Sequence, residues 1–227
     1  HLLLKSLIMY MFDFDDPTHI LFGQGRIADL GAHIPADARV LVLFGGGSIR
    51  RNGVLDQVHA ALAGRTFLEF EGIEPNPSFE TLMQAVELVR REKINFLLAV
   101  GGGSVIDGTK FVAAAALFEG DPWAILEKRG GNITQALPFG SVLTLPATGS
   151  EMNNGSVVTR KSLQAKMAFS SNHCYPKFSV LDPATTLTLP VRQVGNGVVD
   201  AFAHVMEQYL TDPADAPLQD RFAEGLL

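Results

Sequence analysis

Short apolar runs alternate with helical patterns along most of the chain. Two runs, residues 40–44 and 96–100, are apolar without alternation, which is typical of strands buried on both faces of a parallel sheet. Shorter runs at 19–22 and 67–70 predict further strands. The stretches between them have helical spacing, at residues 53–63, 78–92 and 104–117. Strand–helix alternation of this kind predicts an α/β fold with a doubly wound parallel sheet.

The pattern changes after about residue 138. Turn residues then separate four short predicted strands, at 139–146, 156–159, 167–170 and 178–182. From Pro190 the spacing is helical again, over residues 192–210 and 213–227. The amphipathic pattern continues to Leu227 with no glycine cap, so we expect the front portion of a longer protein. Residues 1–10 do not resemble a secretory signal, and no element of the fold is predicted there.

Composition and charge narrow the class of protein. Apolar residues make up 47% and charged residues 19%, which suits a globular chain with a sizeable core. The net charge of −6 gives no support for binding nucleic acid or an anionic membrane. Cys174 is the single cysteine, and no apolar run approaches the roughly 18 residues of a membrane span. We therefore expect a cytoplasmic protein.

A glycine-rich turn follows the predicted strand 96–100. Gly101, Gly102 and Gly103 lead into Ser104, where a helix is expected to begin. Glycines let the backbone approach a ligand closely, and unpaired amides at a helix N-terminus suit a pyrophosphate. A tight strand-to-helix turn with Ser104 as its N-cap explains the same residues about equally well.

A second glycine turn follows the predicted strand 40–44. Gly45, Gly46 and Gly47 precede Ser48, and two arginines, Arg50 and Arg51, come next. Dinucleotide folds that prefer NAD carry an acidic residue near such a strand end to bind the ribose 2′-hydroxyl. With glycines here and arginines close by, we predict NADP as the cofactor. The competing interpretation is that both arginines belong to a solvated helix start.

Two further segments carry candidate chemistry. Residues 143–154 offer Thr144, Thr148 and Asn153 as hydrogen-bonding groups near the expected sheet crevice. Asp200 and His204 are four residues apart, so both project from one helix face. Their oxygen and nitrogen atoms suit a divalent iron or zinc ion. A surface Asp–His pair is the commoner explanation, but the surrounding residues are apolar nearly all round, which predicts a buried pair that needs a partner.

The order of these motifs resembles the iron-containing (group III) alcohol dehydrogenases, a family whose fold also includes dehydroquinate synthase. The matching segments are residues 17–25, 71–77, 101–110, 145–151 and 196–204. Together they cover the chain from about residue 11 to 227. The glycines at 45–47 make it look most like the branch of NADPH-dependent aldehyde reductases and butanol dehydrogenases.

The resemblance implies a role for each matching residue. A dinucleotide-binding domain over residues 11–189 would precede the first helices of a shortened helical metal-binding domain, residues 190–227. The ribose and its 2′-phosphate would lie at Gly45, Gly46 and Ser48, and the pyrophosphate near Gly102, Gly103, Ser104 and Asp107. The inner end of the cleft would be lined by Thr144, Thr148 and Asn153, and Lys166 would reach the cofactor.

The same resemblance implies the chemistry. Asp200 and His204 would be two of four metal ligands, and the other histidines of the chain all precede Asp200. The metal would polarise the carbonyl of an aldehyde while the nicotinamide delivers a hydride. The family also implies a homodimer, in which residues 12–22 pair as an edge strand.

Two other functions remain open from the sequence. One is a nucleotide-binding or assembly module that keeps the cofactor fold without catalysis. The other is a sugar-phosphate cyclase, which residues 145–151 and 196–204 disfavour because they resemble the dehydrogenases. Neither the substrate nor the choice between iron and zinc follows from the sequence.

Overall fold

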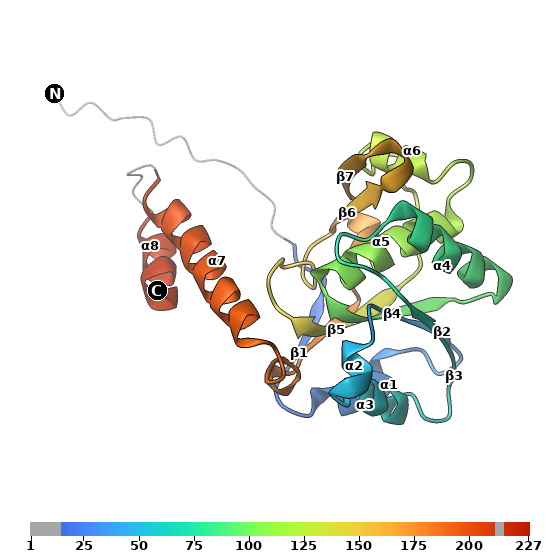
Figure 1. Cartoon of the computed structure of the whole chain (residues 1–227), viewed down its shortest axis with the longest axis horizontal. Coiled ribbons are helices and arrows are strands. Elements are labelled where there is room, and N and C mark those ends of the chain that lie inside the picture. Colours follow the sequence, from blue (N-terminus) through green and yellow to red (C-terminus); the bar gives the residue numbers. More distant parts are fainter. Residues whose placement is uncertain (1–14, 212–215) are drawn as a thin grey trace.

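A six-stranded parallel sheet forms the centre of the molecule (Figure 1). The computed structural model describes residues 15–211 and 216–227. The strands of this sheet are β1 (His19–Phe22), β2 (Arg39–Phe44), β3 (Thr66–Glu71), β4 (Phe96–Gly102), β5 (Phe139–Leu145) and β8 (Phe178–Leu181). Their order is β1-β8-β5-β4-β2-β3, and every neighbouring pair is parallel. The predicted α/β fold with a doubly wound parallel sheet is confirmed.

Helices cover both faces of the sheet, as Figure 1 shows. One core contains side chains of α4 (Phe79–Arg91), α5 (Gly103–Leu117) and α6 (Trp123–Glu127). The opposite core contains side chains of α1 (Leu30–His33), α2 (Ser48–Arg51) and α3 (Val54–Ala61). Along β2, Leu41 and Leu43 enter the first core and Val40 and Val42 the second. Because both faces are covered, the strand is apolar throughout.

A two-stranded hairpin lies outside the main sheet. Its antiparallel strands are β6 (Gly155–Arg160) and β7 (Ala165–Ser170), which match two of the predicted strands. Val158 and Phe169 point into the core on the α5 side. The Ser156 hydroxyl donates to the Asp107 carbonyl oxygen at 2.8 Å. The hairpin is thereby fixed against α5.

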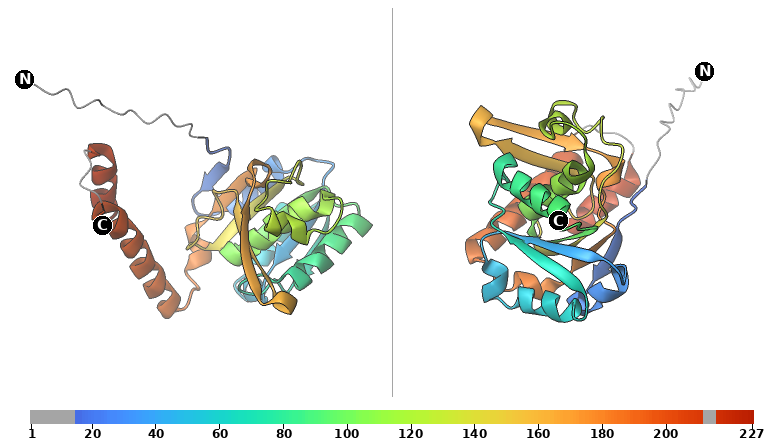
Figure 2. Two further views of the ribbon diagram at one scale, coloured as in Figure 1. Left: turned by 90° about the horizontal axis from the view of Figure 1, so that it is seen from above. Right: turned by 90° about the vertical axis from the view of Figure 1, so that its right-hand side faces the viewer.

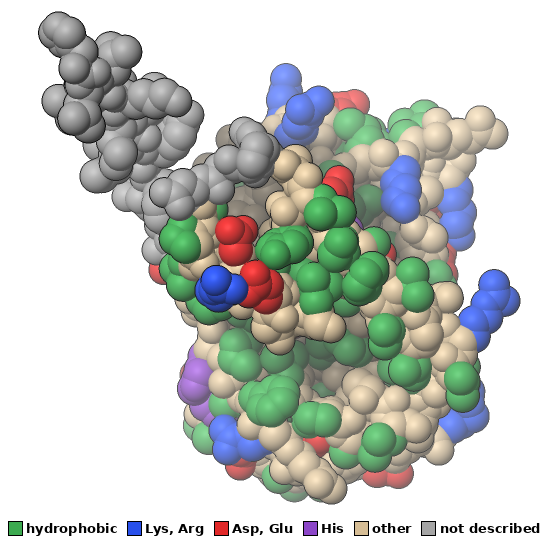
Figure 3. All heavy atoms as spheres, turned by 90° about the vertical axis from the view of Figure 1, so that its left-hand side faces the viewer, with side chains coloured by type: hydrophobic (Ala, Val, Ile, Leu, Met, Phe, Trp, Pro, Cys, Tyr) green, Lys and Arg blue, Asp and Glu red, His purple; other side chains and the backbone are tan. Residues whose placement is uncertain are grey.

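Two helices follow the last strand and stand apart from the sheet (Figure 2). They are α7 (Val191–Tyr209) and α8 (Pro217–Leu226), and neither has a buried residue. The predicted start of the last helix, residues 213–215, lies outside the described residues. Hydrophobic side chains gather on the face that carries these helices (Figure 3), with Val199 67% and Phe202 55% exposed. The expectation of a buried α7 is therefore wrong for the described residues, because α7 packs mainly on the equally exposed α8.

Strand β1 matches the strand predicted at residues 19–22 and occupies one edge of the sheet. Of the edge strand predicted for residues 12–22, residues 15–18 are not in a strand and residues 12–14 lie outside the described residues. Within the described part of the chain, no helix combines the length and apolar character needed to cross a membrane.

Candidate functional site

The carboxyl ends of β2 and β4 border a cleft of about 400 Å³. These two strands are neighbours, but the chain leaves β2 toward α2 on one face and β4 toward α5 on the other. Such a switch point is where doubly wound sheets bind ligands. The lining includes glycines of both predicted turns, Thr144 of β5 and the start of α7: Gly45, Gly47, Ser48, Gly101, Gly102, Thr144, Pro190 and Gln193.

Two glycines of the β4–α5 turn are required by packing. A Cβ at Gly101 would lie 2.6 Å from Cγ2 of Val105, and one at Gly103 would lie 2.3 Å from Oγ1 of Thr148. Real Cβ atoms do not approach other atoms so closely. These two positions therefore demand glycine whether or not a ligand binds.

Gly102 differs from its neighbours. It lines the cleft and is the N-cap of α5, which has no side-chain cap. The expectation of Ser104 as N-cap is wrong, because its hydroxyl instead accepts the backbone N–H of Asn76 at 3.3 Å. A Cβ at Gly102 would be 3.3 Å from Cβ of Leu145, tight but tolerable. Amides without a side-chain cap beside an open cleft fit an anionic group such as a pyrophosphate.

The β2–α2 turn also uses each glycine differently. A Cβ at Gly45 would lie 2.9 Å from the carbonyl oxygen of Ile73, whereas one at Gly46 would meet open space. Gly47 has φ +81°, a left-handed conformation that favours glycine. Gly46 is therefore the position where a side chain can be added without strain.

The two arginines after this turn lie differently. Arg51 lines the cleft. Arg50 instead donates to Oε2 of Glu69 at 2.7 Å and to Oε2 of Glu71 at 3.1 Å, and its guanidinium lies 4.9 Å from the centre of the Phe44 ring. The hydrogen bonds that Arg50 donates to Glu69 and Glu71 raise the pKa of Arg50. Of the two arginines expected near a 2′-phosphate, Arg51 is the one whose side chain borders the cleft.

Two ionisable side chains of α5, the buried Lys110 and the partly buried Asp107, fix the segment that follows β5. Lys110 is fully buried, and its Nζ donates to Oγ of Ser150, to Oδ1 of Asn153 and to the Gly155 carbonyl oxygen at 2.8–2.9 Å. Asp107 accepts the Ser150 hydroxyl at 2.6 Å. Burial raises the pKa of Asp107 and lowers that of Lys110 to about 8. The sequence reasoning gave Lys110 no role, although an Asp and a Lys three residues apart in an apolar helix were the available signal.

A second cavity of about 500 Å³ lies between α5 and the hairpin. Its lining includes three predicted site residues, Asp107, Thr148 and Asn153. Gly45, Ser48, Gly102 and Thr144 line the cleft at β2 and β4 instead. The other predicted cofactor residues are in the lining of neither space: Gly46, Gly103, Ser104 and Lys166.

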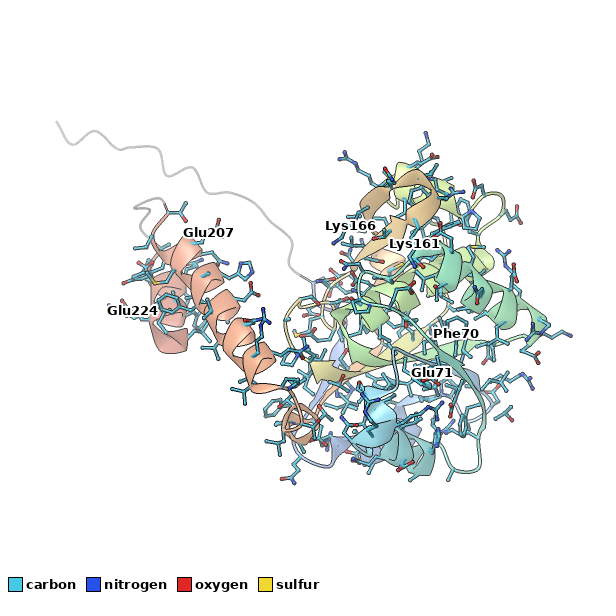
Figure 4. The ribbon with its side chains drawn as sticks, viewed as in Figure 1. Phe70, Glu71, Lys161, Lys166, Glu207 and Glu224 are labelled. Carbon is cyan, nitrogen blue, oxygen red and sulfur yellow. The ribbon has the colours of Figure 1, made fainter. Side chains whose placement is uncertain are left out.

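Lys166 lies on β7 and lines neither of these cavities (Figure 4). Its Nζ donates to Oδ1 of Asn76 at 2.7 Å. Asn76 also bonds Ser104, so one residue connects two predicted site residues that are far apart in the sequence. Asn76 has φ +57°, which Asn tolerates better than most residues, and the sequence reasoning missed it.

Asp200 and His204 lie on one face of α7, as their spacing predicts. Oδ1 of Asp200 is 3.7 Å from Nε2 of His204, and the two side chains are 56% and 68% exposed. The predicted burial of this pair is wrong for the described residues, because α7 has no buried residue and packs mainly on α8. Within residues 15–211 and 216–227, no group of three His, Cys, Asp or Glu side chains could hold a metal ion. The described donors alone therefore do not fit a complete metal site.

A hollow of about 700 Å³ connects Asp200 with the segment after β5. Leu145, Pro146 and Ala147 form one wall, and the first half of α7 forms the other. Because Leu145 also lines the cleft at β2 and β4, this hollow and the cleft are adjacent.

Cys174 is buried and unpaired. Burial raises the pKa of its thiol to about 12, so the thiol stays protonated and unreactive at neutral pH.

Comparison with known proteins gives consistent matches. The family model of the iron-containing alcohol dehydrogenases matches residues 17–183. The chain is 62% identical to the NADPH-dependent aldehyde reductase YqhD of Escherichia coli and 46% identical to a probable NADH-dependent butanol dehydrogenase of Bacillus subtilis. Each alignment covers 96% of this chain and 57% of the relative. The chain thus spans little more than half the length of these relatives.

Solved structures agree with this assignment. The crystal structure of E. coli YqhD superposes with a TM-score of 0.90 at 61% identity, covering 95% of this chain and 56% of that one. The NADH-dependent butanol dehydrogenase A of Thermotoga maritima gives 0.87 at 44% identity, covering 96% and 55%. The chain belongs to the iron-containing alcohol dehydrogenase family.

Proposed function

We propose that this protein acts as an NADP-dependent alcohol dehydrogenase or aldehyde reductase, which transfers a hydride between NADPH and an aldehyde or primary alcohol. The observation that carries the proposal is the cleft at the switch point, where an α5 N-terminus without a side-chain cap meets two glycine turns. The reductase YqhD, with 62% identity, is named for NADPH, whereas the butanol dehydrogenase relative is named for NADH. Family membership therefore leaves the choice of cofactor to the residues of the cleft.

The proposed cofactor contacts follow the shape of the site. Gly45 and Ser48 line the cleft and would face the adenosine ribose together with the neighbouring Gly46, and Arg51 would approach its 2′-phosphate. The pyrophosphate would lie at the start of α5. The full proposed set is Gly45, Gly46, Ser48, Gly102, Gly103, Ser104, Asp107, Thr144, Thr148, Asn153 and Lys166. Of these, Lys166 has the weakest support, because Asn76 already holds its ammonium group.

The segment after β5 would orient the reacting groups. Lys110 and Asp107 of α5 hold Ser150 and Asn153 in place through hydrogen bonds. The apolar wall formed by Leu145, Pro146 and Ala147 would exclude water from the hollow beside the cleft. A small aldehyde or alcohol suits such a space.

Metal dependence is the part of the proposal with least support from the described residues. Asp200 and His204 would contribute one oxygen and one nitrogen ligand to iron or zinc. The other donors would have to come from outside the described residues. We therefore expect this pair alone to bind metal weakly, with water in the remaining positions.

Aldehyde-dependent oxidation of NADPH, with and without a chelator, tests the catalytic proposal. Oxidation that the chelator abolishes would support it. Binding of NADPH without any oxidation would instead favour a nucleotide-binding module, for which the supporting observation is that the described residues supply only two of the expected metal ligands.

The Gly46→Asp substitution tests the cofactor preference. Gly46 accepts a Cβ freely, whereas Asp at Gly45 would strike the Ile73 carbonyl oxygen and confuse a binding defect with a folding defect. The new carboxylate should repel a 2′-phosphate and reverse the preference toward NADH. Unchanged preference in a folded variant would refute the assignment of this turn.

We also propose that two copies pair through the β1 edge to form a homodimer. β1 ends the sheet, and Phe22 at its end is 71% exposed. Sedimentation of the protein and of a Phe22→Lys variant tests this: the variant should be monomeric.

A further inference from the structure

A carboxylate borders the second glycine turn. Glu71 ends β3, the strand next to β2, and Figure 4 shows it there. A Cβ built on Gly47 would lie 3.1 Å from Oε1 of Glu71. Because Gly47 lines the cleft, Glu71 stands directly behind the backbone that would face a cofactor ribose. This neighbour could not be inferred from the glycine motif, since Glu71 belongs to the next strand.

A carboxylate at this place affects the choice between NAD and NADP. In dinucleotide folds that use NAD, an acidic residue about 20 residues after the first glycine turn accepts a hydrogen bond from the ribose 2′-hydroxyl. The same carboxylate repels a 2′-phosphate. An unpaired Glu71 would therefore oppose the NADP preference proposed above.

Arg50 pairs with this carboxylate. Its Nε and Nη2 atoms lie 3.3 and 3.1 Å from Oε2 of Glu71, a two-donor contact with one oxygen. Glu69 and the ring of Phe44 hold the guanidinium from the other sides. The second oxygen of Glu69 is taken by Nε2 of His59 at 2.6 Å, so Glu69 has a further partner of its own.

We propose that Arg50 is a specificity-determining residue, which neutralises Glu71 so that the glycine turn accepts the 2′-phosphate of NADP(H). Arg50 acts through Glu71 rather than by touching the phosphate, and Arg51 is the arginine that lines the cleft. The inference rests on the proposed function. It adds that the cofactor preference depends on an ion pair outside the glycine motif.

Cofactor binding by a double-mutant cycle tests the proposal. NADPH and NADH are titrated separately, by nicotinamide fluorescence, into the parent chain, Arg50→Met, Glu71→Gln and the double variant. Arg50→Met should weaken NADPH binding about tenfold, because a phosphate and an unpaired carboxylate then repel each other at close range. Binding of NADH should change less than twofold. Adding Glu71→Gln should restore most of the affinity for NADPH.

Two controls distinguish the loss of the Arg50–Glu71 ion pair from the effect of removing any surface arginine or of the chosen replacement. Arg91→Met removes an exposed arginine that pairs with Glu92 elsewhere on the surface, and it should change neither affinity. Arg50→Gln repeats the test with a polar replacement. Since Arg50 is 44% exposed, both of its variants should fold, which circular dichroism checks.

The remaining outcomes overturn the proposal in distinguishable ways. Equal losses of NADPH affinity with and without Glu71→Gln would mean that Arg50 contacts the phosphate directly. Binding of both cofactors with an unmoved preference would refute the role of the ion pair and leave the proposed function standing. If the parent chain binds neither cofactor, the proposed function and this inference fail together.

Discussion

Replacing Lys110 with Met removes the buried ammonium that holds the segment after β5. Nζ of Lys110 donates to Ser150, Asn153 and the Gly155 carbonyl group, all from within the core. In the variant the Gly155 carbonyl oxygen loses this donor, and Asp107 loses a cation that favours its charged form. A hydrogen bond that involves a charged group contributes about 1.5–3 kcal/mol. We expect a loss of about 3 kcal/mol at pH 7, because Ser150 and the Val157 amide still donate to Asp107.

The loss should grow with pH. Burial lowers the pKa of Lys110 from 10.5 to about 8 in the folded chain. Below about pH 8 both the folded and the unfolded chain hold this proton, so the lysine adds no pH dependence. Between about pH 8 and 10.5 only the unfolded chain still binds it, so the folded parent gains about 1.4 kcal/mol per pH unit. The Met variant lacks this gain, and the difference should widen by about 3 kcal/mol at most.

Urea unfolding at pH 7, 8, 9 and 10 measures this difference for the parent and for Lys110→Met. Titrations of other groups are common to both chains and cancel. Lys128→Met, which removes an exposed lysine, is the matched control and should give a constant difference across the series. A constant difference for Lys110→Met as well would refute a lowered pKa at this site.

Three further outcomes test the site. Gly102→Ala should weaken NADPH and NADH alike, about tenfold or more, with little change in the melting temperature; normal cofactor binding would reduce this turn to a structural role. Gly103→Ala should instead lower the free energy of unfolding by about 1–3 kcal/mol, measured in urea, because the new methyl overlaps Thr148. His204→Ala should leave urea unfolding within about 0.5 kcal/mol of the parent, since the side chain is exposed, and calorimetry should show that it abolishes the weak zinc binding expected of the parent. Tight binding of one zinc ion per parent chain would contradict the expectation that Asp200 and His204 form only part of a metal site.

The fold was predictable where local pattern and burial agree. Residues 40–44 and 96–100 are apolar without alternation because helices cover both faces of β2 and β4. The start of α4 also follows from a local signal, because Ser78 is its N-cap and the Ser78 hydroxyl oxygen accepts the Thr81 amide at 3.3 Å. By contrast, exposure of α7 could not be inferred, since an apolar pattern does not say which element covers it.

The site was less predictable, because its geometry depends on partners distant in sequence. Arg50 and Arg51 are neighbours with equal sequence signals, yet two carboxylates on β3 hold one of them and the other lines the cleft. Lys166 donates to Asn76, a partner 90 residues away in the sequence, and its predicted contact with the cofactor stays a prediction. Neither contact leaves a periodic trace in the sequence.

In the two glycine turns, the presence of a glycine-rich motif is weaker evidence for a bound ligand than the surroundings of each single glycine. Gly45, Gly101 and Gly103 would each clash with protein atoms if they carried a Cβ, so packing alone requires them. Gly46 would carry a Cβ in open space, and Gly102 would carry one at a tolerable distance. Only at these last two positions can a requirement for glycine come from a bound molecule. A substitution there that the fold accepts and the cofactor rejects would therefore separate a binding turn from a structural one.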